Sequence, residues 1–192
     1  MTSNRRTTVA GRRVAAAVLG PGAIALALMV TAMPSMAATT GVILGQTHEN
    51  YFCIASDQWI QTSSPGLDYV VPAGETTLTK WSTNGGAAGG TMQFEVWAPA
   101  GGTDYTLVYI SAPTVLLPGI VTHVAVQPHV QLAAGDVIGY RSVTDTDCAV
   151  QAGKPGDAYV YDPSSGPPTV GSTVQFQGPA TGFRFNVAAV VN

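Results

Sequence analysis

The feature that most constrains this chain is a series of short runs in which apolar and polar residues alternate. A period of two is typical of β-strands that bury one face, and clusters of Gly, Pro, Ser and Asp close the runs as turns. The predicted strands are 50–54, 67–71, 76–82, 91–98, 104–111, 120–126, 136–141, 158–161, 172–176 and 183–191. Many short strands without a helical period predict an all-β fold, an antiparallel sandwich or a barrel. We expect a single domain that forms a jelly-roll-like β-sandwich.

Residues 1–37 have the layout of a secretory signal peptide. Four arginines come first without an acid, an apolar stretch runs from 14 to 32, and the small residues 35–37 follow. We therefore expect export, by either the general or the twin-arginine route, with cleavage after residue 37. The β-sandwich domain would then span 38–192. The alternative is an uncleaved membrane anchor, since about 20 apolar residues span a bilayer. Gly20, Pro21 and Gly22 interrupt such a helix, so no stable membrane span is expected after cleavage.

Without the signal peptide the chain is acidic. Lys80, Arg141, Lys154 and Arg184 are its four cations, and they face eleven acids, which gives a net charge of −7. A surface that binds a polyanion needs clustered Lys and Arg to displace counterions. Four scattered cations do not supply one, so nucleic acid is not an expected partner.

The only two cysteines, Cys53 and Cys148, are expected to form a disulfide. An even pair in an exported chain indicates a bridge, and it would close a loop of about 95 residues for about 4 kcal/mol on the chain-entropy account. Two free thiols or a metal pair are the alternative, but the sequence has no CxxC or Cys/His spacing to support it.

The sequence carries no recognisable catalytic constellation. His48, His123 and His129 are isolated, and no serine stands in a Gly-x-Ser-x-Gly elbow. Zinc-type ligand spacing is also missing. We therefore expect no catalytic residue, no cofactor and no metal centre.

One acidic cluster is open to a second interpretation. Asp145 and Asp147 stand two residues apart, and Asp157 and Asp162 follow in nearby loops. Carboxylates so placed can supply oxygen ligands to calcium, but the EF-hand pattern is incomplete. A solvated acidic turn beside the disulfide is the preferred interpretation.

Aromatic side chains are the candidate ligand-binding residues. Rings with an apolar face and a polar tip stack on sugars, and Trp81, Trp97, Trp59, Tyr159 and Tyr161 could serve. Trp81 and Trp97 lie out of phase with the apolar residues of their own strands, which would place both rings on an outer face. The alternative is that both tryptophans belong to the core.

A run of Gly and Ala between Trp81 and Trp97, residues 84–90, is expected to be a permissive hairpin loop. Its four glycines predict a connection too flexible to be preorganised for tight binding. The loop itself is therefore not expected to be a binding site.

Several short motifs resemble a family of secreted actinobacterial β-sandwich proteins without an established function, a domain often found ahead of thrombospondin type 3 repeats. The motifs are a Val-Pro-x-Gly turn, a strand ending in Trp-Ser-Thr, a glycine-rich loop and an alternating strand followed by proline, within 69–99, then YTLV at 105–108, LLPG at 116–119, VQLAAGDVIGY at 130–140, Cys148 and the closing 183–191. The resemblance implies export and a β-sandwich, but no catalytic residue. Thrombospondin repeats bind calcium; these 192 residues contain none, so that function is not carried over.

Three functions follow from this sequence. The leading hypothesis is a secreted, non-enzymatic binding or interaction module at the cell surface, with polysaccharide or another surface protein as partner. The second is a structural protein of the envelope or matrix that self-associates, which a large exposed apolar patch would favour. The third is a secreted hydrolase of unrecognised type, which two carboxylates facing each other across a cleft would favour.

Overall fold

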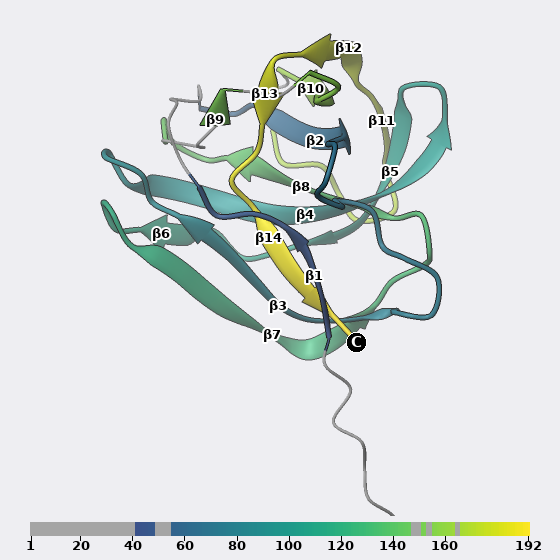
Figure 1. The fold of residues 1–192 in the computed structure, drawn as a ribbon, viewed down its shortest axis with the longest axis horizontal. Helices are drawn as coiled ribbons and strands as arrows, with labels where there is room; N and C mark the ends of the chain where they lie inside the picture. The colour runs from purple at the N-terminus through teal and green to yellow at the C-terminus, as the bar shows by residue number, and fades with distance from the viewer. Residues whose placement is uncertain (1–40, 49–54, 147–150, 153–154, 164–165) are drawn as a thin grey trace, which may run out of the picture. The chain divides into compact units, whose positions relative to one another are not determined.

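The computed structural model describes residues 41–48, 55–146, 151–152, 155–163 and 166–192. These residues form an all-β structure of antiparallel sheets packed together (Figure 1). The strands are β1 (Val42–Gly45), β2 (Gln58–Ser63), β3 (Thr77–Asn84), β4 (Gly90–Gly101), β5 (Asp104–Ile110), β6 (Thr114–Leu116), β7 (Val121–Gln131), β8 (Val137–Ser142), β9 (Gln151–Ala152), β10 (Ala158–Asp162), β11 (Thr173–Gln175), β12 (Gln177–Thr181), β13 (Phe183–Arg184) and β14 (Ala188–Val191). Within the described ranges there is no helix long and apolar enough to cross a membrane.

The strand order is that of a jelly roll. One sheet has the order β1-β14-β3-β7, and the centre of the other has the order β2-β8-β4-β5. Strand β1 thus pairs with β14, and β2 pairs with β8. The chain crosses repeatedly between the two layers, which is the doubled Greek key of a jelly roll. Strands β9 to β13 are an insertion between the last two strands of this plan. The jelly-roll-like sandwich expected from the sequence is confirmed.

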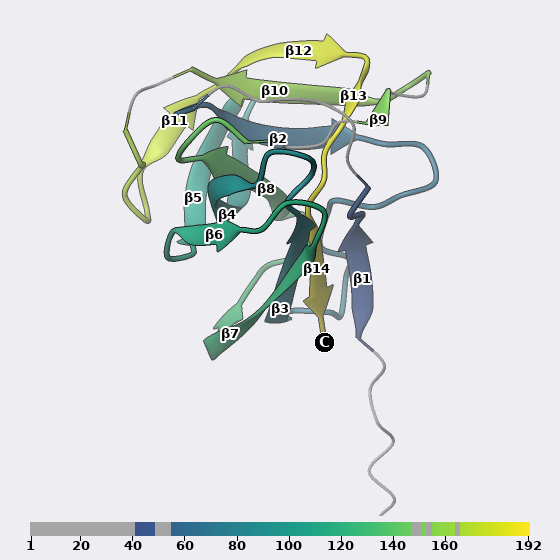
Figure 2. The ribbon, with the colours of Figure 1, turned by 90° about the vertical axis from the view of Figure 1, so that its left-hand side faces the viewer.

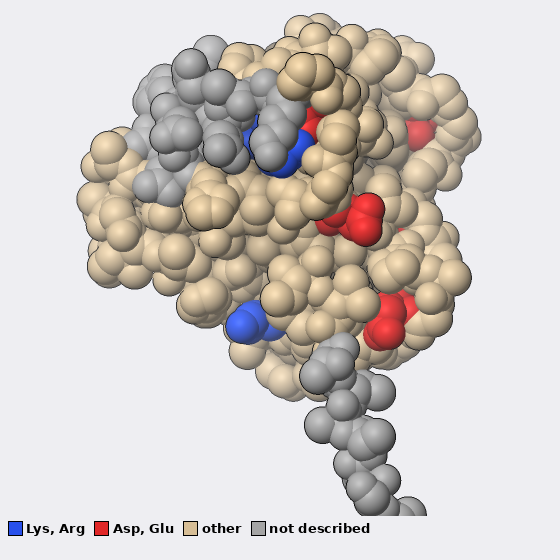
Figure 3. All heavy atoms as spheres, in the orientation of Figure 1, with Lys and Arg blue, Asp and Glu red and all other residues tan. Residues whose placement is uncertain are grey.

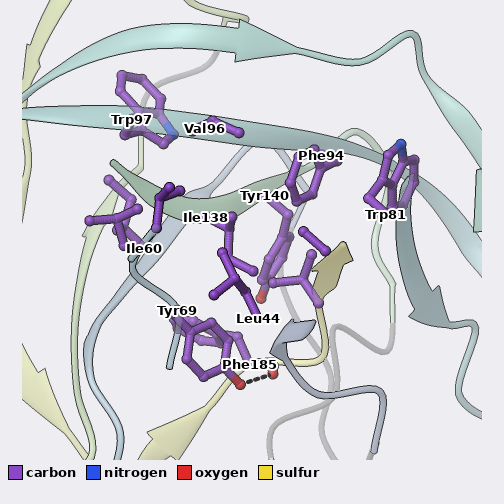
Figure 4. Close-up of a cluster of buried hydrophobic side chains, with 14 of the residues drawn as sticks. Leu44, Ile60, Tyr69, Trp81, Phe94, Val96, Trp97, Ile138, Tyr140 and Phe185 are labelled. Carbon is purple, nitrogen blue, oxygen red and sulfur yellow. Dashed lines mark hydrogen bonds between the residues drawn. The ribbon is translucent and has the colours of Figure 1, made fainter. Parts of the chain in front are cut away.

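The main core lies between the two sheets. Trp81 of β3 and Phe94 of β4 stack across the gap with their ring centroids 5.5 Å apart and their planes 10° apart. Tyr140 and Phe185 meet edge to face nearby, and the Tyr69 hydroxyl donates a hydrogen bond of 2.6 Å to the Phe185 carbonyl (Figure 4). All five side chains are almost completely buried, so aromatic packing holds the two layers together.

The larger sheet curls and creates a second interior. Strands β11 and β12 stand at opposite ends of its order, yet Phe176 alone separates them in the chain (Figure 2). The ring of Phe176 meets Trp97 and Tyr105 edge to face, at 5.0 and 5.5 Å between centroids. The face of the sheet that looks away from the first core is therefore also covered, and both faces of β4 and β8 are buried.

Three predictions from the sequence about strands and their faces are wrong. The run 183–191 is not one strand but two, β13 and β14, with 185–187 between them. Residues 67–71 form no strand, although Val70 makes an isolated antiparallel bridge to Val137. Trp81 is not out of phase with the core, because the pairing of β3 shifts register between Leu78 and Lys80 and so brings Leu78 and Trp81 to the same buried side. A bulge of this kind breaks the period of two on which the phase argument depended.

Some predictions from the sequence lie outside the described residues. They are the signal peptide over 1–37, the strand over 50–54 and the disulfide between Cys53 and Cys148. These stay predictions.

An apolar end as the candidate functional site

The predicted ligand-binding tryptophans are core residues. Trp81 and Trp97 each expose 0% of their surface, the first between the two sheets and the second inside the curl of the larger sheet (Figure 4). Trp97 does point away from Phe94 and Val96, as its phase predicted, but Phe176 covers that face. Neither ring is presented to solvent in this conformation, so the hairpin with core tryptophans is the interpretation that the structure supports.

The other three predicted aromatics do come together. Trp59 on β2 stacks on Tyr161 of β10, with centroids 5.4 Å apart, and lies 5.7 Å from Tyr159. Tyr159 in turn packs edge to face on Phe185 at 5.2 Å. Trp59 and Tyr161 are half-buried, and Tyr159 is buried. This cluster extends the core between the sheets, and its ring faces are largely used by one another.

The glycine-rich loop is locked, contrary to the flexibility expected from its composition. The Gly85 N–H donates to the Ile120 carbonyl at 3.0 Å, the Gly89 N–H to the Gly85 carbonyl at 2.8 Å, and the Gly119 N–H to the Gly86 carbonyl at 2.5 Å. A Cβ added to Gly85 would stand 2.0 Å from the Leu117 carbonyl oxygen. The glycines are therefore needed for close backbone packing between 85–90 and 116–120, rather than for mobility.

Against this locked loop the chain displays a group of exposed apolar side chains, which we call the apolar end: Val115, Leu117 and Ile120. They expose 70%, 57% and 50% of their surface, and they are three of the six large apolar residues found exposed in the described part of the chain. Val115 and Leu117 stand on one side of the buried Leu116, as alternation requires, and Ile120 ends the turn that Leu117 begins. Exposed neighbours Ala87, Ala88 and Pro118 continue the surface.

The apolar end belongs to a part of the sequence without charge. No Asp, Glu, Lys or Arg occurs between Lys80 and Glu95, or between Asp104 and Asp136. In Figure 3 the end of the molecule that carries these loops, at the left, shows no blue or red sphere. Asp145, whose backbone oxygen lies beside Gly90, marks the polar rim. An uncharged apolar centre with a polar rim is the anatomy of a protein interface.

The acidic residues considered for calcium have separate partners. Asp157 pairs with Arg184 at 2.7 Å, Asp162 accepts a hydrogen bond from the Gln58 amide at 3.0 Å, and Asp145 accepts one from the Ala55 N–H at 2.8 Å. Asp147 lies outside the described residues. A search of the described residues finds no group of three or more His, Cys, Asp or Glu that could hold a metal ion.

One ionisable group lies deep inside the curled sheet. Glu95 exposes 0% of its surface, and burial raises its pKa to about 8, although a hydrogen bond from the Trp97 indole and the charge of Arg141 both act to lower that pKa. Within the described residues the Oε1 atom of Glu95 and the Nε atom of Arg141 have no hydrogen-bond partner. The carboxyl is therefore largely protonated at neutral pH. The packing that raises its pKa also leaves it inaccessible to solvent and to any substrate.

No protein-family model matches the chain, and no curated protein or solved structure matches it either. The resemblance to the secreted family described above therefore stays a prediction from its sequence motifs.

Reasoning from the sequence missed the apolar end. The motif LLPG at 116–119 contributes to the family resemblance, but by itself it does not predict an exposed apolar surface. The available signal was the stretch without charge from 105 to 135, in which Val115, Leu117 and Ile120 follow closely on one another. Whether such residues lie in a core or on the surface depends on how the loops fold, which alternation does not reveal.

Proposed function

We propose that this protein is an exported, non-enzymatic β-sandwich module that associates with a second copy of itself through the apolar end. The observation that carries the proposal is the exposure of Val115, Leu117 and Ile120 on a locked loop. Each of these side chains would be buried by a partner at little cost in conformational entropy, because the hydrogen bonds of the loop already hold the backbone.

The charge distribution favours a second copy as the partner. The whole chain has a net charge of −3, and residues 38–192 alone have −7, so two copies repel each other over most of their surface. At the apolar end neither copy brings a charge to the contact. In a twofold pair the same patch meets itself, and an uncharged apolar patch is complementary to itself.

The test is the oligomeric state of the purified chain as a function of concentration, measured by sedimentation equilibrium. We expect a reversible monomer–dimer equilibrium that Leu117→Asp weakens at least tenfold, because two buried carboxylates would face each other across the contact. The matched control is Val170→Asp, since Val170 is equally exposed, at 56%, and lies in another loop.

Two outcomes would overturn self-association. One is a chain that stays monomeric at every concentration. The other is an equal effect of Leu117→Asp and Val170→Asp, which would mean that added charge, rather than the apolar end, drives the change. Export is tested separately, by sequencing the amino terminus of the protein recovered from the culture medium, which we expect to begin at residue 38.

A further inference from the structure

A pocket of about 250 Å³ opens beside the loop that follows β2, and it shares no residue with the apolar end. It is lined by the polar residues Gln61, Thr62, Ser63, Ser64 and Asp68 and by Pro65, Leu67, Tyr69 and Val70. From this geometry we propose that the pocket binds a single neutral sugar residue. This inference goes beyond the proposed self-association and does not depend on it.

The polar group that the pocket offers to a ligand is the Asp68 carboxylate, because the Oγ atom of Ser64, although it has no hydrogen-bond partner in the described part of the chain, is itself buried. No hydrogen bond or ion pair is seen at the Asp68 carboxylate among the described residues, and this residue is exposed. A carboxylate accepts short, strong hydrogen bonds from hydroxyls. Two adjacent hydroxyl groups of a polyol can donate to the two oxygens of the Asp68 carboxylate.

The frame around the pocket is rigid. The Gln61 Nε2 donates to the carbonyls of Ser63, Ala158 and Phe183 at 2.9 to 3.1 Å. Across the loop, Arg184 donates to the Pro65 carbonyl at 3.2 Å. Preorganised polar groups beside apolar surface fix the orientation of a small ligand.

Charge and size select the class of ligand. Among the described residues that line the pocket, Asp68 alone is charged. The guanidinium of Arg184 is held by Asp157 at 2.7 and 3.1 Å and by Pro65, so it does not neutralise an anionic ligand. The pocket is smaller than the roughly 300–1,000 Å³ of pockets for drug-sized molecules. A neutral ring of one sugar unit therefore fits better than a uronic acid, a sulfated sugar or a longer oligomer bound along its length.

The test is a titration of the ¹⁵N-labelled chain, followed by amide chemical shifts, with glucose, galactose, mannose and N-acetylglucosamine as probes. We expect saturable shifts at Leu67, Asp68 and Val70 with one or more of these sugars, at dissociation constants of the order of millimolar. Glucuronic acid, which carries a carboxylate, should give no saturable shift at these amides.

Variants distinguish a site from general crowding. Asp68→Asn should weaken sugar binding about tenfold or more, because a charge-assisted hydrogen bond is lost, and Ser64→Ala, which removes a buried hydroxyl, should leave binding nearly unchanged. Glu75→Gln is the matched control, a carboxylate outside the pocket, and should leave binding unchanged. The proposal is overturned by no saturable shift with any of the four sugars, by equal binding of glucuronic acid, or by shifts that Asp68→Asn leaves unchanged. A chain that forms dimers but shows no shifts with sugar would refute sugar binding at this pocket and leave the proposed self-association standing.

Discussion

The indole N–H of Trp97 donates a hydrogen bond of 3.0 Å to the Oε2 atom of Glu95, two residues earlier on β4, and both side chains are fully buried. Residues two apart on a strand share a face. The pair therefore lies inside the curl of the larger sheet, where an acid without a cationic partner in contact is most stable in its protonated form.

Glu95 makes stability depend on pH. Its pKa is about 8 in the folded chain, against 4.5 for an unperturbed carboxyl. Well below pH 4.5 the Glu95 carboxyl is protonated in both the folded and the unfolded chain. As the pH rises toward 8, only the folded chain keeps this proton. Ionisation in the unfolded chain therefore lowers the free energy of unfolding, by about 3 kcal/mol at pH 7. Glu95→Gln, whose amide oxygen can still accept from Trp97, should flatten the decline in unfolding free energy between pH 5 and 8. Urea titrations at both pH values check this, with Glu75→Gln as control; parallel profiles for wild type and Glu95→Gln would refute it.

The ion pair between Arg184 and Asp157 should be sensitive to the loss of one partner. Both side chains are almost completely buried, and two guanidinium nitrogens contact the Asp157 Oδ1. Arg184→Met leaves a buried carboxylate without its cation, so we expect a loss of about 3–5 kcal/mol in unfolding free energy. Adding Asp157→Leu to this variant should restore part of the lost unfolding free energy. A double-mutant cycle by urea unfolding gives the coupling, and a single-variant loss below about 1 kcal/mol would contradict the prediction.

Gly85 should tolerate no side chain, since a Cβ there would overlap the Leu117 carbonyl oxygen. Gly85→Ala is expected to cost about 1–3 kcal/mol of unfolding free energy through overpacking, and to weaken self-association by displacing the loop under the apolar end. Gly166→Ala is the control, because a Cβ at Gly166 meets nothing within 4 Å. Thermal unfolding of the two variants measures the difference; equal midpoints would show that the loop is as permissive as its composition suggests.

Much of the fold could be predicted because alternation is a local signal. The runs around Phe94, Leu107 and Ile138 predicted β4, β5 and β8 nearly at their observed bounds. The short strands β1 and β6, by contrast, exist through pairing with distant partners, β14 and β4. Three or four residues carry too little pattern to predict such pairing.

The sites could be predicted less well, because burial of a face depends on what packs over it. Trp97 was assigned correctly to the face opposite Phe94, and only the return of the chain through Phe176 makes that face an interior. The pocket beside Asp68 and the apolar end at Leu117 are both made by loops, whose conformation follows from distant hydrogen bonds such as that from Gly85 to Ile120.

The edges of the two sheets also bear on how copies of this protein can meet. The edge strands of an open sheet have unpaired N–H and C=O groups, and strands of other chains can hydrogen-bond to them one after another. The two ends of the longer sheet are poor templates for this, because β11 has only three residues and β12 carries Pro179, which has no N–H to offer a neighbour. The order of the smaller sheet leaves β1 and β7 at its edges, and β7 carries Pro128, which has no N–H to offer a neighbour. A pair formed through the apolar end, as proposed, would therefore close through side chains and would leave few backbone groups at which further copies could extend a fibre.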